Sequence, residues 1–572
     1  MIREKLRQFV EEAIYANWDR EDLGDLDIKI DVEERPAFGD YATNVAFAAS
    51  KKVGTTSLSF AEKLVPYLNE NKIPEVEKIE FVAPGFINFY LSPTLLQQQV
   101  GLISGDENYG LGDSLKNKTV MVEFTDPNPF KLFHIGHLMS NAIGESISRL
   151  YEASGAKVIR ANYQGDKGLH VAKAIYGTQQ IIKENDSGDI KRGILLGLGY
   201  SKGSQAFEND EQARKEIEEI NRKIYDRSNP EINELYDLGR KWSLDYFEEI
   251  YKKLGTKFDN YFFESETGKD GLDVINQNKQ IFIESEGTTI FKGEDYGLHT
   301  RVFISSKGLP TYEAKELGLN KKKFELYPLD LSVVITGNEI NDYFKVLLKV
   351  MSLIMPEVAE KTRHVSHGML RLPSGKMSSR TGDVITAEAL IEQTKERVEA
   401  IARQGEKSAG DTDASDTEAI AIGAIKYSIL KQSLGKDIIF DFDKSLSLEG
   451  DSGPYVQYAY ARLKSILSSA GDISPEGVDY GQLTHETELN LIRHLLWFPD
   501  VVKESSDNLS PNHLVLYVYK LANAVNNFYE KVHILNDENK DRMAARLALV
   551  EAVAKVLASG LDILGIKVLE KI

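Results

Sequence analysis

The alternation of apolar and polar positions divides the chain into three regions. In the first region, an amphipathic helical pattern at 2–14 precedes strand-like apolar runs at 28–32 and 86–91. The stretch 105–113 is rich in glycine, aspartate and asparagine, which predicts turns and the first domain boundary. We therefore expect residues 1–105 to fold as a small α+β domain.

The second region opens with a pattern typical of parallel-sheet proteins. Residues 119–124 form a strand-like run, residues 134–154 carry an apolar stripe at helical spacing, and residues 157–163 again suit a strand. A strand, a helix and a strand in succession predict a βαβ unit, which places ligands at the carboxyl ends of its strands.

More strand-like runs extend this sheet domain. They lie at 299–304, 332–336 and 364–370. The segment 173–285 is mostly polar with helical spacing, and we interpret it as an insertion into the sheet domain. The domain then covers residues 106–400.

The third region, residues 401–572, is predicted to be helical almost throughout. The run 405–418 is small and acidic without an apolar period, which predicts a flexible loop. Helical spacing of apolar residues then continues to a last helix at 546–564. The predicted fold class is therefore α/β, with a Rossmann-like parallel sheet between an α+β domain and a helical domain.

Composition excludes several classes of protein. The 572 residues are 42% hydrophobic and 27% charged, as in ordinary globular proteins, and none is cysteine. Disulfides, catalytic thiols and thiolate zinc sites are thereby excluded. No apolar run approaches the roughly 18 residues of a membrane span, and the first residues lack the apolar core of a signal peptide. We expect a cytoplasmic protein without membrane contact.

Two histidines and a glycine lie where the first strand of the sheet domain leads into its helix. They are His134, Gly136 and His137. Unpaired amides and the helix dipole favour an anion at a helix N-terminus, and imidazoles can donate to phosphate oxygens. Gly136 lacks a Cβ, so a flat ring can lie against the backbone. Taken alone, the motif is equally explained by a capped helix with incidental histidines.

A second candidate is the basic loop Lys376 to Arg380, which follows the strand-like run 364–370. A glycine-flanked loop with lysine and arginine suits a triphosphate on which charge builds up during reaction. A solvated basic turn is the simpler explanation of such a loop by itself. Two such elements at the edge of one sheet favour a nucleotide site.

The two elements resemble the HIGH and KMSKS signatures of class I aminoacyl-tRNA synthetases. The wider sequence is similar to arginyl-tRNA synthetases over nearly its whole length, in segments 38–46, 84–89, 122–137, 162–168 and 450–462. The resemblance implies three domains: one at 1–105 that contacts the tRNA elbow, a catalytic domain at 106–400, and a helical anticodon-binding domain at 401–572.

The same resemblance implies ligation of L-arginine to tRNA(Arg) through an arginyl-adenylate, with ATP and its Mg²⁺ and with no zinc or other metal site. It assigns catalysis to His134, His137, Lys131 and Lys376, and ATP binding to His134, Gly136, His137, Lys376, Met377, Ser378 and Arg380. Ser379 replaces the second lysine of KMSKS, so either Lys131 or Lys376 could contact the α-phosphate.

For arginine, the resemblance points to Glu123, Asn128 and Tyr312, and to Glu316 where the family usually has aspartate. A guanidinium has five donors in a rigid fork, so its pocket needs carboxylates and an aromatic ring. Tyr312 and Glu316 are four residues apart and would share a helix face. Each residue alone could instead be an exposed acid in a salt bridge or a core tyrosine.

Candidate tRNA contacts lie in both flanking domains. They are Phe86 and Asn88 in the first domain, and Tyr455, Gln457, Tyr458, Arg462 and Tyr529 in the last. Aromatic rings near cations suit unpaired bases, although helical tyrosines more often pack inside a protein. The formal net charge of −19 requires any tRNA surface to be locally basic.

Three other functions remain open from the sequence. They are a class I synthetase for another amino acid, a tRNA-binding paralogue without catalysis, and a small-molecule nucleotidyltransferase. The whole-length similarity disfavours the first, and the retained motif residues disfavour the second. The third would need neither flanking domain. We expect the protein to be a monomer.

Overall fold

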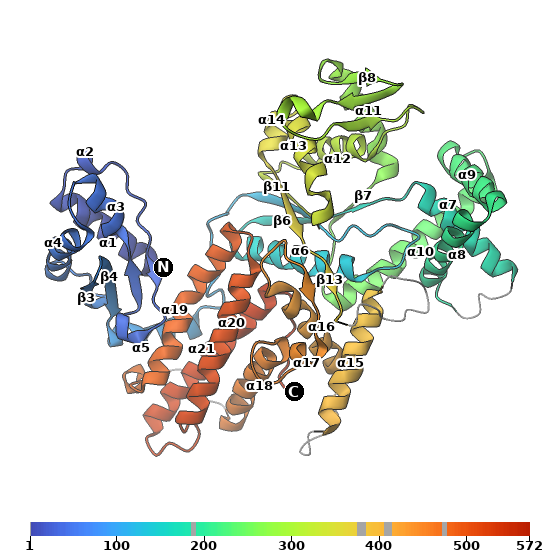
Figure 1. Cartoon of the computed structure of the whole chain (residues 1–572). Helices are drawn as coiled ribbons and strands as arrows, with labels where there is room; N and C mark the ends of the chain where they lie inside the picture. The colour runs from blue at the N-terminus through green and yellow to red at the C-terminus, as the bar shows by residue number, and fades with distance from the viewer. Residues whose placement is uncertain (1, 185–189, 374–384, 405–413, 472–476, 572) are drawn as a thin grey trace.

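The computed structural model describes residues 2–184, 190–373, 385–404, 414–471 and 477–571. Figure 1 shows an N-terminal domain at the left, a central sheet with lobes above and to the right, and a helical bundle below. The three-part organisation predicted from the hydrophobic pattern is therefore confirmed. Among the described residues, no helix is long and apolar enough to cross a membrane.

The N-terminal domain is an antiparallel sheet packed against helices. The sheet order is β1-β2-β4-β3. Its strands are β1 (Asp31–Val32), β2 (Tyr41–Thr43), β3 (Val76–Val82) and β4 (Phe86–Leu91), and its helices are α1 (Ile2–Asn17), α2 (Arg20–Leu23), α3 (Val45–Lys52) and α4 (Ser57–Glu70). The apolar stripe of α1 is buried through Leu6, Val10 and Ile14, as its spacing predicts. Helix α5 (Pro93–Gly105) leads to the next domain.

The central sheet has five parallel strands in the order β12-β11-β5-β6-β7. They are β5 (Thr119–Glu123), β6 (Lys157–Gln164), β7 (Asn260–Phe263), β11 (Leu331–Gly337) and β12 (Thr362–His367). Helix α6 (Ile135–Ala153) connects β5 to β6 and completes the predicted βαβ unit. From β5 the chain first adds β6 and β7 on one side and later adds β11 and β12 on the other side. At such a change of direction a crevice opens at the carboxyl end of the strand, here β5.

The predicted insertion at 173–285 needs correction, because β7 lies within it and pairs with β6 in the central sheet. This strand of only four residues is hidden in a mostly polar, helical sequence. The right-hand lobe before it contains α7 (Leu169–Lys183), α8 (Arg192–Asn209), α9 (Glu211–Asp226) and α10 (Pro230–Leu254).

The upper lobe in Figure 1 follows β7. It contains α11 (Glu264–Gln277), β8 (Ile283–Ser285), β9 (Thr288–Phe291), β10 (Arg301–Ile304), α12 (Tyr312–Leu326), α13 (Asn341–Ile354) and α14 (Pro356–Glu360). The predicted strand at 299–304 is therefore real, but β10 pairs antiparallel with β9 in a separate small sheet. It does not extend the central one.

The C-terminal region is a bundle of long helices. They are α15 (Ala387–Gln404), α16 (Ala414–Leu430), α18 (Gly453–Ala470), α19 (Glu486–Asp507), α20 (Pro511–Lys531) and α21 (Lys540–Ile563). Short elements interrupt the helices: β14 (Ile438–Ile439) pairs with β13 (Leu370–Arg371), and α17 (Phe442–Ser445) follows. Of the predicted loop 405–418, residues from Ala414 onward belong to α16, and 405–413 lie outside the described residues.

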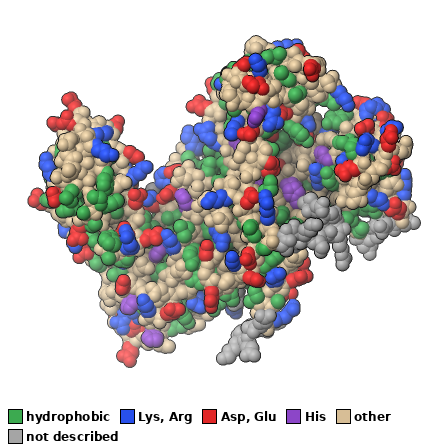
Figure 2. All heavy atoms as spheres, in the orientation of Figure 1, with side chains coloured by type: hydrophobic (Ala, Val, Ile, Leu, Met, Phe, Trp, Pro, Cys, Tyr) green, Lys and Arg blue, Asp and Glu red, His purple; other side chains and the backbone are tan. Residues whose placement is uncertain are grey.

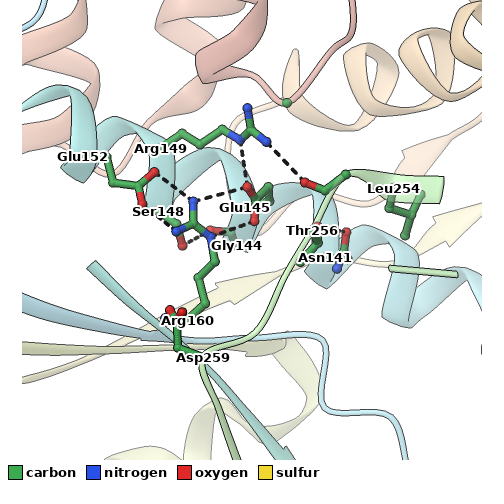
Figure 3. Close-up of polar contacts among 12 residues, drawn as sticks. Asn141, Gly144, Glu145, Ser148, Arg149, Glu152, Arg160, Leu254, Thr256 and Asp259 are labelled. Carbon is green, nitrogen blue, oxygen red and sulfur yellow. Dashed lines mark hydrogen bonds and ion pairs between the residues drawn. The ribbon is translucent and has the colours of Figure 1, made fainter. Parts of the chain in front are cut away.

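A network of charged side chains surrounds helix α6, with Glu145 between Arg149 and Arg160 (Figure 3). Glu145 is buried and accepts from Arg149 Nε at 2.7 Å and Arg160 Nε at 3.0 Å. Arg149 also donates to Asp562 Oδ1, near the end of α21, at 2.7 Å. The helix that begins at the histidine motif is thereby fixed relative to the C-terminal bundle.

Candidate active site

A cleft of about 800 Å³ opens at the carboxyl end of β5 and brings the predicted arginine and histidine residues together. Its lining includes Glu123, Asn128, His134, Gly136, His137, Tyr312 and Glu316. In Figure 2 histidine side chains are visible at a hollow between the upper lobe and the right-hand helices. Residues that are far apart in the sequence thus share one concave surface, as expected for a ligand site.

The loop after β5 has an unusual backbone conformation. Thr125, Asp126 and Phe130 have φ angles of 77°, 44° and 69°, values that residues other than glycine rarely adopt. Three hydrogen bonds hold the loop: Thr125 N donates to Ser140 Oγ, Tyr163 N to Asp126 Oδ1, and Phe130 N to Ser243 Oγ, at 2.7 to 2.9 Å. Such strain persists where the surroundings over-determine it, and it fixes the position of Asn128 in the cleft.

His134 caps the N-terminus of α6. Its Nδ1 accepts from the amides of Gly136 and His137 at 3.1 and 3.4 Å, and its own amide donates to His137 Nδ1 at 3.2 Å. The amide of Ile135 donates to Ile385 O. The expectation of unpaired amides for a phosphate is therefore corrected, because the chain itself bonds them. We call His134, Gly136 and His137 the histidine end of the cleft.

Both imidazoles at the histidine end are neutral. Burial, with help from the nearby charge of Lys131, lowers the pKa of His134 to about 4. Burial and the neighbouring His134 lower the pKa of His137 well below its usual value. Because each Nδ1 accepts a hydrogen bond, the proton of each neutral ring lies on Nε2. Each Nε2–H is therefore a donor that the cap does not use.

Gly136 is required by the same cap. A Cβ at this position would lie 2.9 Å from the His134 ring. The two imidazoles stack with ring centroids 3.5 Å apart. A side chain at position 136 would therefore displace His134 from the helix terminus.

The predicted lysines are placed differently from the histidines. Lys131 is not part of the cleft lining, and its ammonium lies 4.9 Å from the centre of the Tyr200 ring. Lys376, Met377, Ser378 and Arg380 lie outside the described residues. Residues after them return to the histidine end, since Ala387 N donates to Phe133 O at 3.0 Å.

At the opposite end of the cleft, carboxylates surround one lysine. Glu123 at the end of β5 is 1% exposed, and Lys323 Nζ lies 2.6 Å from its Oε2. Glu316 Oε2 is buried and has no hydrogen-bond partner among the described residues. We call Glu123, Asp126, Glu316 and Lys323 the carboxylate end.

The carboxylates there are crowded, and this changes their protonation. Burial and the charge of Glu123 raise the pKa of Glu316 to about 8. The same causes raise the pKa of Asp126 well above its usual value. Glu316 is therefore mostly protonated at neutral pH when no cation faces it.

Tyr312 lies at the mouth of this end. It is 65% exposed, and its carbonyl accepts from Tyr343 Oη at 3.2 Å. One turn along α12, Lys315 donates to Glu264 at 2.6 Å. The Lys315 ammonium lies 5.1 Å from the centre of the Tyr312 ring, and the exposed ring lines the cleft, where it can pack against a ligand.

Sequence reasoning missed Asp126 and Lys323. Asp126 lies inside the segment that resembles the family, but its acceptance of the Tyr163 amide depends on how β5 and β6 pair. Lys323 is seven residues after Glu316 on α12, a spacing that places both on one helix face. That spacing was the available signal for Lys323.

The candidate tRNA residues of the N-terminal domain differ in exposure. Phe86 is 42% exposed and packs edge-on against Phe47. Asn88, two residues further along β4, is only 4% exposed. Strand alternation puts both side chains on one face of β4, but this face is exposed at Phe86 and buried at Asn88. Asn88 is therefore corrected to a buried position without access for tRNA.

The C-terminal candidates divide in the same way. The Arg462 guanidinium lies 4.8 Å from the ring centres of both Tyr458 and Tyr529, and Tyr529 is 47% exposed. Tyr455 Oη donates to Asn523 at 2.6 Å. Gln457 is fully buried, and its amide donates to Lys567 O at 2.8 Å. It joins α18 to the end of the chain and is corrected to an internal role.

Two further observations bear on metals. Among the residues that the structure describes, no group of three or more His, Asp or Glu side chains could hold a metal ion. His364 and His367 on β12 are engaged otherwise: His364 stacks on Phe344 and contacts Thr336 Oγ1, and His367 contacts Gly368 O.

Comparison with known proteins gives matches along the whole chain. The description "Arginyl tRNA synthetase N terminal domain" matches residues 1–91, "tRNA synthetases class I (R), catalytic domain" matches 100–442, and "DALR anticodon binding domain" matches 456–572. An arginine–tRNA ligase of Treponema denticola is 33% identical over 588 residues, covering 95% of this chain and 94% of that protein. One of Clostridium botulinum is 31% identical over 574 residues, with 99% of each covered.

Solved structures agree in fold. The arginyl-tRNA synthetase of Thermus thermophilus is similar with a TM-score of 0.84 and 24% identity, covering 100% of both chains. That of Plasmodium falciparum has a TM-score of 0.80 and 22% identity, covering 100% of this chain and 99% of the other.

Proposed function

The chain belongs to the arginyl-tRNA synthetase family and joins arginine to tRNA at the expense of ATP, and from that premise we propose how its cleft performs the reaction. The observation that carries the proposal is the convergence of two different ends in one cleft. The histidine end offers neutral donors, and the carboxylate end offers a buried carboxyl without a partner.

The reaction has two steps and needs no side-chain nucleophile. The arginine carboxylate attacks the α-phosphorus of ATP, which forms arginyl-adenylate and releases pyrophosphate. A hydroxyl of the terminal tRNA ribose then attacks the arginyl carbonyl, and AMP leaves. Catalysis consists of holding the reacting groups in line and stabilising the charge on phosphate.

The carboxylate end binds the arginine side chain. Glu316 and Glu123 accept from the guanidinium, and the Tyr312 ring packs against it at the mouth of the cleft. Asn128, on the strained loop, faces the end of the amino acid nearer the histidines. A neutral side chain of similar size would leave the buried carboxylates unpaired, which supplies selectivity without a separate editing step.

The histidine end binds ATP. His134 and His137 donate from Nε2 to phosphate oxygens, and Gly136 leaves room for the ring stack beside them. Lys131 and the loop residues Lys376, Met377, Ser378 and Arg380 supply positive charge toward the phosphates, and Mg²⁺ arrives with ATP. Of the two lysines, Lys131 adds its charge from beside the histidines, whose pKa values it lowers.

The flanking domains hold tRNA(Arg). Phe86 is accessible for the elbow. Half-buried Tyr458 and Arg462 and exposed Tyr529 form a group of rings and charge for unpaired anticodon bases. On the face shown in Figure 2, positive and negative side chains are interspersed. Any basic surface that binds tRNA therefore covers only part of the molecule. The enzyme works as a monomer in the cytoplasm and carries no zinc.

Charging of total tRNA with a panel of single amino acids tests this function. The proposal predicts ATP-dependent transfer of arginine and of no other amino acid. Transfer of a different amino acid would indicate a synthetase of another specificity. Binding of tRNA without any charging would indicate a paralogue that has lost catalysis.

A further inference from the structure

Lys323 is a buried cation beside the proposed arginine pocket, behind the Glu123 carboxylate that lines it. It lies on α12, is 0% exposed, and has Glu123 Oε2 at 2.6 Å. Neither Lys323 Nζ nor Glu123 Oε2 has a hydrogen-bond partner among the described residues, so the contact between them is described as an ion pair. Lysine is almost never fully buried unless its charge is compensated, so the pair with Glu123 accounts for its presence.

A cation is unexpected in a pocket whose ligand is itself a cation. Lys323 repels a guanidinium by its charge, yet it lies on the same helix face as Glu316 and Tyr312. A residue that only filled space at this position could be apolar. The charge of Lys323 therefore needs an explanation in terms of the carboxylates around it.

The balance of charges at the carboxylate end explains why position 323 carries a cation. If Glu123 and Glu316 are both ionised and Lys323 is charged, the pocket carries one net negative charge, which a single guanidinium matches. Asp126 adds none, because burial and Glu123 raise its pKa well above the usual range. The charge of Lys323 opposes the rise in the pKa of Glu316, so without Lys323 the ionisation of Glu316 beside Glu123 would be harder still.

Resting on the function proposed above, we propose that Lys323 is a positioning residue for arginine recognition: its ammonium holds the Glu123 carboxylate in place, so that Glu123 and Glu316 together receive the guanidinium. Lys323 itself does not touch the substrate. In the arginine complex, where Glu316 has lost its proton, Glu123, Glu316 and Lys323 together carry one net negative charge, which the guanidinium balances.

The variant Lys323→Met tests the role of this charge, since methionine fills most of the same volume. At pH 7 the arginine KM is expected to rise roughly tenfold or more, with a smaller change in kcat at saturating arginine and with the KM values of ATP and tRNA unchanged. The matched control is Lys322→Met, which removes the adjacent lysine of α12 and its exposed pair with Glu266.

A pH series separates recognition from structure. The charged and titratable groups near the site include Glu123 of β5, Asp126 of the following loop, Tyr163 of β6, Glu264 of α11, Glu316 and Lys323 of α12, and Tyr343 of α13. Loss of Lys323 makes ionisation of the carboxylates harder, so the KM deficit of Lys323→Met should shrink between pH 7 and pH 9. A deficit that is constant over this range would overturn the proposal, as would an unchanged arginine KM.

The double variant Glu123→Gln/Lys323→Met guards against misfolding, because it removes both charges of the pair. It should unfold near the wild-type temperature and still show an arginine KM raised roughly tenfold or more, since the Glu123 charge is missing. A wild-type arginine KM in the double variant would show that the pair is only structural. Failure of the wild-type protein to charge tRNA with arginine would instead contradict the proposed function.

Discussion

At the histidine end of the cleft the chain bonds its own polar groups, whereas at the carboxylate end Glu316 Oε2 is buried without a partner. The first end is complete before any ligand arrives: His134 caps α6, and both imidazoles are neutral. The second end is complete only when a cation enters. The comparison teaches that one end positions a phosphate by prearranged donors, while the other selects its ligand through a buried carboxyl that has no partner in the chain.

The largest expected effect comes from removing the Glu316 carboxyl, which has no partner in the chain. Glu316→Gln keeps the volume of the side chain, so the expected loss in kcat/KM for arginine is about 2 to 4 kcal/mol, roughly 30- to 1000-fold. Citrulline, which is neutral at the same end, should become a better competitor relative to arginine. Steady-state charging with varied arginine measures both.

The control for this variant is Glu325→Gln, on the same helix, where the carboxylate is exposed and pairs with Lys321 at 2.8 Å. It should leave the arginine KM unchanged. If Glu316→Gln also leaves it unchanged, the two ends do not differ in the way described.

The histidine end can be tested by separating its cap from its donor. His134→Ala removes both, and it is expected to lower the free energy of unfolding by about 1 kcal/mol and the rate of adenylate formation by roughly 100-fold. His134→Asn can still cap α6, so it should recover stability while the rate stays low. Chemical unfolding and arginine-dependent ATP–pyrophosphate exchange, with tRNA present, are the measurements.

Full exchange activity in His134→Asn would show that the imidazole Nε2 does not contact phosphate. The histidine end would then be a structural cap, and ATP would have to be held by other residues.

The two ends should also respond differently to pH. Burial and the charge of Glu123 raise the pKa of Glu316 to about 8. In the empty pocket the Glu316 carboxyl therefore holds a proton below that pH, and a guanidinium must displace this proton. The arginine KM is therefore expected to fall as pH rises toward 8, by at most about tenfold per unit, and to level off above it.

The ATP KM should not follow this curve, because burial lowers the pKa of His134 to about 4 and the ring stays neutral throughout. A flat arginine KM between pH 6.5 and 8.5 would contradict the protonated state of the empty pocket.

The smallest effect is expected away from the cleft. Tyr529→Ala removes an exposed ring beside Arg462, and the tRNA KM should rise about fivefold, as for one lost stacking contact, with no change for arginine. Tyr296→Ala is a matched control, since both rings are 47% exposed. Equal tRNA KM values in the two variants would remove Tyr529 from the tRNA surface.

The histidine end could be predicted from sequence because its residues are adjacent in the chain, and a strand followed by an amphipathic helix places them at a helix terminus. Its self-capping could not, since it depends on imidazole orientation. At the carboxylate end, helical spacing was enough to place Tyr312 and Glu316 on one helix face. The pairing of Lys323 with Glu123 joins α12 to β5, which are far apart in the sequence, so no local pattern indicates it.

Burial was the other limit of prediction. Alternation in β4 places Phe86 and Asn88 on one face but does not say where the interior begins, and helical spacing does not show that Gln457 points toward the end of the chain. The strand β7 was missed because four residues between long polar helices carry too short a pattern. In each case long-range packing, and not local preference, determines the outcome.

The most direct test of the central claim, that the carboxylate end awaits a cation, is the number of protons released when arginine binds. Calorimetric titration of the protein with arginine at pH 7, without ATP and in buffers of different ionisation enthalpy, measures this number. The account predicts release of about one proton per arginine in the wild-type protein and none in Glu316→Gln. Arginine binding with no proton release by the wild-type protein would contradict it.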